Sequence, residues 1–136
     1  MTSTRRLLVV ANRTADSDEL FDELHNRAEQ DPIAVTLLVP QELYGGAGRR
    51  LNAALTRLHE AGIAAEGMLG DTDPVIAVQD AWSPDRFDEI VVSTLPSGVS
   101  RWLGLDLPHR VSRLTGAPVA HVVAQERQEA RSVTIS

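Results

Sequence analysis

Short apolar runs alternate with longer amphipathic segments along the whole chain. The central example is Ile90-Val91-Val92, which lies in a strand expected from Glu89 to Ser93. A run that is apolar on both of its faces is typical of a parallel strand covered by helices on both sides. The same reasoning predicts the set of strands, at residues 7–11, 33–39, 64–69, 89–93 and 118–123.

Residues that typically start or end helices lie between these predicted strands. Asp16 or Ser17 can cap the first helix, and Asp73 followed by Pro74 is a strong start for the third. Gly62 is placed to end the second helix in a left-handed conformation. The predicted helices lie between residues 16 and 31, 49 and 61, 73 and 83, and 106 and 116.

The last helix is expected to begin at Leu107, with Asp106 as its N-cap. The segment 99–105 before it is predicted to be a short helix or an irregular lid. Apolar stripes at helical spacing should face the sheet, and Ile76 and Leu114 are among the inward residues they predict.

Strands alternating with helices at this spacing predict an α/β fold with a doubly wound parallel sheet and helices on both faces. The length of 136 residues suits one domain. We expect that domain to span residues 1–124 and residues 125–136 to form a polar tail or an extra edge strand. Ligands of such sheets bind at the carboxyl ends of the strands, where the strand order reverses.

The charge and cysteine content exclude several functions. A net charge of -6 argues against binding to nucleic acid or to an anionic membrane, and the absence of cysteine excludes thiolate chemistry. No metal-ligand spacing connects the four histidines, and no nucleophile elbow is present. We therefore expect a cytoplasmic protein without catalytic or metal-binding residues; a nucleotide hydrolase would rest on fold analogy alone.

The hydroxyl-rich turn after the fourth strand is the best candidate for a ligand site. Its hydroxyls, its glycine and its arginine could hold an anion at the start of the following helix. The alternative is a polar turn whose hydroxyls cap backbone groups. The candidate residues are Ser93, Thr94, Ser97, Gly98, Ser100 and Arg101, with Arg13 from the neighbouring loop.

The order of the segments resembles the universal stress protein family over nearly the whole chain. The matches are Leu7 to Val10, the turn Gly70-Asp71 before Pro74, Phe87 to Val92 and Gly116 to Val122. The resemblance implies a five-stranded parallel sheet of order 3-2-1-4-5, like that of the adenine nucleotide alpha hydrolases. It also implies a homodimer that forms through the last strand, with Val119, His121 and Val123 as the interface candidates.

The nucleotide-binding branch of that family has an Asp after the first strand and a spaced glycine motif after the fourth. Here the region Asn12-Arg13 replaces the Asp. Counted from Ser93, the three motif glycines fall on Ser93, Pro96 and Asp106. Aligning from Pro118 instead moves only the last of these to Leu105. The sequence thus predicts a member without the conventional ATP site, which acts in stress response or regulation through dimerisation and protein partners.

The alternative is a binder of ATP, AMP or another small anion at the same end of the sheet. The family's pocket would then be bordered by the ends of the second and third strands. Asp71 could accept ribose hydroxyls there, or it could be a turn residue before the Asp73 cap. The remaining ligand candidates are Asn12, Val39, Gly70 and Asp71.

Overall fold

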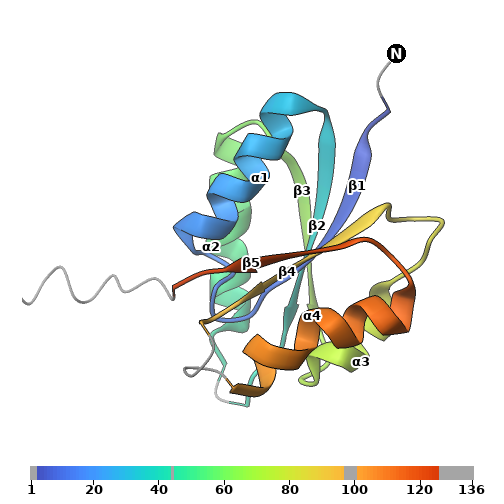
Figure 1. Ribbon diagram of the computed structural model, residues 1–136. Coiled ribbons are helices and arrows are strands. Elements are labelled where there is room, and N and C mark those ends of the chain that lie inside the picture. The colour runs from blue at the N-terminus through green and yellow to red at the C-terminus, as the bar shows by residue number, and fades with distance from the viewer. Residues whose placement is uncertain (1–2, 44, 97–100, 126–136) are drawn as a thin grey trace, which may run out of the picture.

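Five parallel strands form the central layer of the protein, in the order β3-β2-β1-β4-β5 (Figure 1). The computed structural model describes residues 3–43, 45–96 and 101–125, with only the backbone of 101–106. The predicted doubly wound sheet and its strand order are both confirmed. The strands are β1 (Arg5–Val10), β2 (Ile33–Pro40), β3 (Ala64–Gly70), β4 (Glu89–Thr94) and β5 (Val119–Val123).

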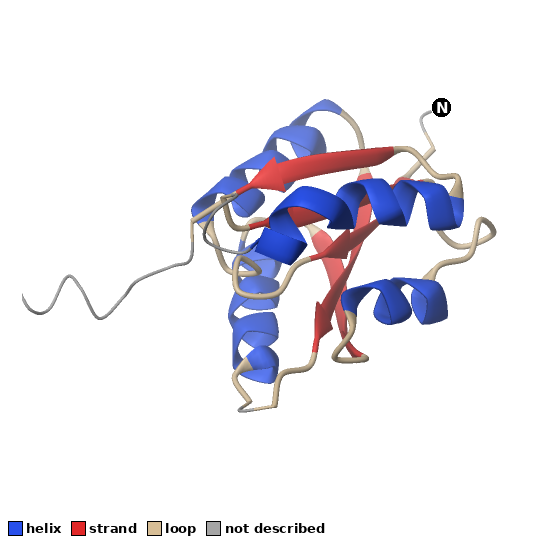
Figure 2. Ribbon diagram, turned by 60° about the horizontal axis from the view of Figure 1, so that its bottom comes forward, coloured by secondary structure: helices blue, strands red, loops and turns tan. Residues whose placement is uncertain are grey.

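Two helices cover each face of this sheet. The helices α1 (Asp18–Gln30) and α2 (Ala47–Glu60) pack on one face, and α3 (Pro74–Ala81) and α4 (Arg101–Thr115) pack on the other. Figures 1 and 2 show the two pairs on opposite sides of the strands. The order of the strands reverses between β1 and β4, which places the expected ligand crevice beside their carboxyl ends.

The two central strands are buried on both faces. In β1, Leu7 and Val9 belong to the core under α1 and α2, whereas Leu8 and Val10 belong to the core under α3 and α4. All of these side chains are at most 1% exposed. Because burying one such side chain contributes roughly 1.5–3 kcal/mol, this strand needs helices on both sides to be stable.

The predicted helix caps form as expected. Ser17 accepts a hydrogen bond from the backbone N–H of Leu20 (3.2 Å), and Asp73 accepts one from that of Val75 (2.9 Å). Gly62 has a φ of 79° just beyond α2, a conformation that side chains with a Cβ rarely adopt. Local capping chemistry therefore sets these helix boundaries.

The start of the last helix was predicted wrongly. The helix α4 begins at Arg101, so Asp106 lies inside it and is not its N-cap. Pro108, which suits the first turn of a helix, lies within α4 instead. A proline inside a helix removes one backbone hydrogen bond without necessarily ending the helix. Of the two alternatives for residues 99–105, a short helix or an irregular lid, the helix is found from residue 101, where it is continuous with α4, and residues 99 and 100 lie outside the described part of the chain.

Two residues expected to face the sheet do not. The side chains of Ile76 and Leu114 are each 42% exposed. The short helix α3 turns Ala77, Val78 and Ala81 toward the sheet, which leaves Ile76 on its outer side. A helix of eight residues offers too few turns for its apolar stripe to be assigned from spacing alone.

Charged side chains hold the amino ends of β1 and β4 together. Arg6 donates to both carboxylate oxygens of Asp88, at 3.1 and 3.0 Å. These hydrogen bonds lower the pKa of Asp88 to about 2. The neighbouring Glu89 is buried and accepts from both Arg5 and Arg27 at 2.9 Å. Polar contacts thus fix the register of β4 against β1 at the end opposite the candidate site.

We predict that Gly70→Ala will destabilise the protein. A Cβ at residue 70 would lie 2.7 Å from the Cβ of Ala77 and 2.9 Å from a methyl carbon of Leu38, so α3 would have to move away from β3. Overpacking of this kind costs about 1–3 kcal/mol, measurable by urea unfolding. Gly48→Ala is the matched control, because nothing lies within 4 Å of the added Cβ. Equal stability of the two variants would contradict the prediction.

Candidate functional site

A small hollow lies at the carboxyl ends of β1 and β4, where the sequence places the ligand site. It has a volume of about 20 Å³, enough for roughly one water molecule. Three of the predicted ligand residues, Asn12, Ser93 and Thr94, line this hollow together. The other described residues that line it are Val10, Ala11, Pro40, Pro74 and Leu107.

The two strand-end hydroxyls already have partners within the protein. The hydroxyls of Ser93 and Thr14 share a hydrogen bond of 2.6 Å, and both side chains are buried. The hydroxyl of Thr94 lies 2.7 Å from Nε2 of His121 on β5. A ligand that used either hydroxyl would have to compete with these contacts, each of which links two elements of the fold.

Arg50 joins the ends of β1 and β2 across the same region. Its Nε donates to the carbonyl oxygen of Asn12 (3.1 Å), and one of its terminal nitrogens donates to Oδ1 of Asn12 (3.0 Å). That nitrogen also pairs with the carboxylate of Glu42, which follows β2. The guanidinium of Arg50 therefore lies between the two loops and bonds both the backbone oxygen and the side-chain oxygen of Asn12.

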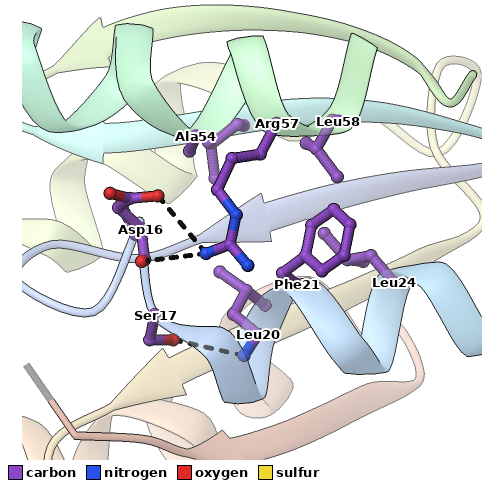
Figure 3. Close-up of a pocket in the computed structure, with 10 residues that line it drawn as sticks. Asp16, Ser17, Leu20, Phe21, Leu24, Ala54, Arg57 and Leu58 are labelled. Atoms are coloured by element: carbon purple, nitrogen blue, oxygen red, sulfur yellow. Dashed lines mark hydrogen bonds and ion pairs between the residues drawn. The ribbon is translucent and has the colours of Figure 1, made fainter. Parts of the chain in front are cut away.

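A second arginine of α2 holds the other end of the β1–α1 loop (Figure 3). Arg57 contacts the carbonyl oxygen of Asp16 at 3.3 Å and its carboxylate at 3.5 Å, and its guanidinium lies 4.4 Å from the centre of the Phe21 ring. The remaining cavity between α1 and α2 is about 10 Å³. Since Arg50 and Arg57 are two helical turns apart, one face of α2 fastens the loop at both ends.

The other ligand candidates are more scattered. Val39 is fully buried in the core under α1 and α2, and Gly70 packs against α3. Asp71 accepts a hydrogen bond from the backbone N–H of Asp73 (2.9 Å), as expected of a turn residue. Arg13 is exposed in the β1–α1 loop. Of the rest, Ser97, Gly98 and Ser100 lie outside the described residues, as does the side chain of Arg101.

Two contributors to this end of the sheet were missed by the sequence analysis. Thr14 contacts Ser93 and Arg50 contacts Asn12 through hydrogen bonds, but neither Thr14 nor Arg50 belongs to a motif. The spacing of seven residues between Arg50 and Arg57 was the available signal, because it places both on one face of α2. Their partners Asn12 and Asp16 are distant in sequence and could not be assigned from that spacing.

The described part of the chain holds no group of three or more His, Asp or Glu residues that could bind a metal ion. None of its helices is long and apolar enough to cross a membrane. The histidines lie on separate elements, with His25 on α1, His59 on α2, His109 on α4 and His121 on β5. Partial burial lowers the pKa of His121 below its ordinary value.

Comparison with solved structures identifies the fold. A universal stress protein in complex with cAMP superimposes with a TM-score of 0.62 and 22% identity, covering 90% of this chain and all of the other. A universal stress protein family protein from Arabidopsis thaliana with AMP bound gives 0.60 and 17%, covering 96% and 97%. No protein-family model and no curated protein matches the sequence. The resemblance to universal stress proteins is thereby confirmed in the fold.

We predict that the Thr14–Ser93 hydrogen bond couples the β1–α1 loop to β4. Thr14→Val leaves the buried Ser93 hydroxyl without this partner, which should cost about 1–3 kcal/mol of unfolding free energy. Ser93→Ala should be costly for the same reason, but the double variant should lose less than the sum of the two. Urea unfolding of the four proteins measures this coupling, and strictly additive losses would disprove it.

Proposed function

We propose that this chain is a universal stress protein-like regulatory protein of the cytoplasm that works as a homodimer without the conventional ATP site of that family. One observation carries the proposal. The protein's own side chains occupy the polar atoms at the carboxyl ends of β1 and β4, through Arg50, Thr14 and His121. The protein would act through other proteins rather than through catalysis.

The size of the hollow supports the absence of a conventional nucleotide site. Pockets for small molecules usually enclose about 300–1,000 Å³. The described residues here leave about 20 Å³, and Arg50 with Glu42 spans the neighbouring loops. A nucleotide could enter between these loops only if those contacts opened, which would oppose binding.

The outer edge of β5 supports the proposed dimer. The carbonyl oxygen of Pro118 and the N–H of Ala124 bond to β4. Because alternate residues of a strand direct their backbone groups to the same side, Val119, His121 and Val123 direct theirs away from the sheet. The side chain of Val123 is 52% exposed, so, among the described residues, this edge combines unpaired backbone groups with apolar surface.

The opposite edge of the sheet is less open to pairing. On β3, the outward carbonyl oxygen of Ala65 lies 2.7 Å from Nε2 of His59, a residue in the last turn of α2. The strand also carries the exposed Glu66, and charged residues on edge strands discourage pairing. The described residues of β5 include no Asp, Glu or Arg, so β5 is the edge suited to a second copy.

We predict a dimer that Val123→Glu converts to a monomer. The substitution places a carboxylate on the pairing edge, where it would lose solvation and face the second copy. Light scattering at micromolar concentration should show half the mass of the native protein. Leu69→Glu is the matched control, because Leu69 is a similarly exposed apolar residue on β3. A native protein that is monomeric would contradict the proposed dimer.

A nucleotide or other small anion as ligand is the second candidate function. It is favoured by the cAMP and AMP bound to the two similar structures and by the grouping of Asn12, Ser93 and Thr94. Under our first proposal, millimolar ATP, AMP or cAMP should leave the melting temperature unchanged, with or without Mg²⁺. A ligand at a hundred times its Kd would add about 2.7 kcal/mol, a rise of several degrees.

A saturable rise would overturn the first proposal in favour of the second. Asn12→Ala would then separate a specific site from general stabilisation, since Asn12 lines the hollow and Arg50 holds it there. Loss of the rise in this variant would assign the ligand to the β1–β4 crevice. An unchanged rise would place the ligand elsewhere on the protein.

A further inference from the structure

We propose that Arg50 and Asn12 form a binding site for a small phosphate anion, and that the carboxylate of Glu42 competes with that anion for the guanidinium of Arg50. This site rests on the proposed function, in which the native crevice lacks a conventional nucleotide site. It is carried by the contacts that Arg50 makes with Asn12 and with Glu42.

The guanidinium of Arg50 is already positioned for an anion. Its Nε donates to the carbonyl oxygen of Asn12 (3.1 Å), and one terminal nitrogen donates to Oδ1 of the same residue (3.0 Å). Neither bond involves Glu42, so both can hold the guanidinium at the end of β1 when the carboxylate leaves. The planar fork of a guanidinium matches the oxygens of a carboxylate and of a phosphate alike.

Asn12 offers a second donor beside Arg50. Because its Oδ1 accepts the bond from Arg50, its Nδ2, on the same carbon atom, lies next to the guanidinium. Within the described part of the chain, no acceptor is bonded to this Nδ2. The tetrahedral oxygens of a phosphate can accept from Arg50 and Asn12 together, with charge-assisted hydrogen bonds from the guanidinium.

Positive charge is concentrated at this point. A Cβ added to Gly46 would lie 3.0 Å from a terminal nitrogen of Arg50 and 3.8 Å from one of Arg49, so both guanidiniums lie close to this glycine. Among the described residues, Glu42 is the one carboxylate paired with either of them. Two guanidiniums against one carboxylate leave an excess of positive charge here, in a chain of net charge -6.

The ion pair of Arg50 and Glu42 is accessible enough to be exchanged. The two side chains are 22% and 28% exposed, so solvent reaches them, but salt screens them less than a pair on the open surface. Glu42 is tethered to the chain, and its high effective concentration lowers the apparent affinity of every free anion. A divalent phosphate gains more from the positive charge than chloride or acetate does, so phosphate is the anion expected to displace Glu42.

The hollow beside Asn12 limits the rest of the ligand. Asn12 lines this hollow with Ser93 and Thr94, but its volume of about 20 Å³ holds roughly one water molecule. The base and ribose of a nucleotide would find no enclosed space there. Inorganic phosphate and AMP should therefore bind with similar affinity, and adenosine should not bind.

Removal of the competing carboxylate tests the site. Glu42→Ala should bind inorganic phosphate roughly tenfold or more tightly than the native protein, because the fraction of free Arg50 rises. Titration calorimetry at constant ionic strength measures the two affinities. Glu60→Ala is the matched control, since it removes the same charge from the exposed end of α2 and should bind phosphate as the native protein does. Equal phosphate affinity of the two variants would overturn the competition.

A second measurement locates the anion. By NMR of isotope-labelled Glu42→Ala, phosphate should shift the side-chain amide signals of Asn12, which are identified by their absence from the spectrum of Asn12→Asp. The amide signals of Asn26, near the far end of α1, should not move. In Glu42→Ala/Arg50→Gln the tight binding should be lost. Phosphate binding without a shift at Asn12 would place the anion elsewhere and overturn the site.

The phosphate site and the proposed function can fail separately. A native protein whose melting temperature rises with AMP but not with phosphate would overturn the proposed absence of a nucleotide site. An unresponsive native protein with no gain in Glu42→Ala would overturn the phosphate site alone. In Glu42→Ala, AMP binding much more tightly than phosphate would show that the nucleoside is recognised, which would contradict a site for phosphate only.

Discussion

The central strands β1 and β4 can be stable only when both of their faces are covered. Leu7, Leu8, Val9 and Val10 are almost completely buried, in two separate cores. One layer of helices would leave half of these side chains in water. This constraint divides the helices between the two faces, and the division creates the reversal of strand order between β1 and β4. The crevice at their carboxyl ends is a geometric result of that burial.

Most of the fold could be predicted because it is encoded locally. Runs of β-branched residues such as Ile90 to Val92 mark buried strands, and Ser17, Asp73 and Gly62 mark helix ends through contacts a few residues away. The start of α4 could not be predicted in this way. Pro108 commonly marks the first turn of a helix, and no local signal shows that α4 extends seven residues before it.

The location of the candidate site could also be predicted, but its contents could not. The strand topology places Asn12, Ser93 and Thr94 together, and in the structure they line one hollow. Arg50 and Thr14 meet their partners across 38 and 79 residues of sequence. Contacts between residues so far apart in sequence depend on how the helices pack on the sheet, so hydrophobic periodicity does not predict them.

The contact between His59 and the edge of β3 has a consequence for the size of any assembly. A sheet with two free edges can add a copy at each, and repeated addition would give a growing fibre. Here His59 in the last turn of α2 contacts a backbone carbonyl on one edge, while no bond among the described residues pairs the outward backbone groups of β5 on the other. If the proposed dimer forms through β5, a contact that hinders pairing at β3 would favour closure at two chains over continued addition.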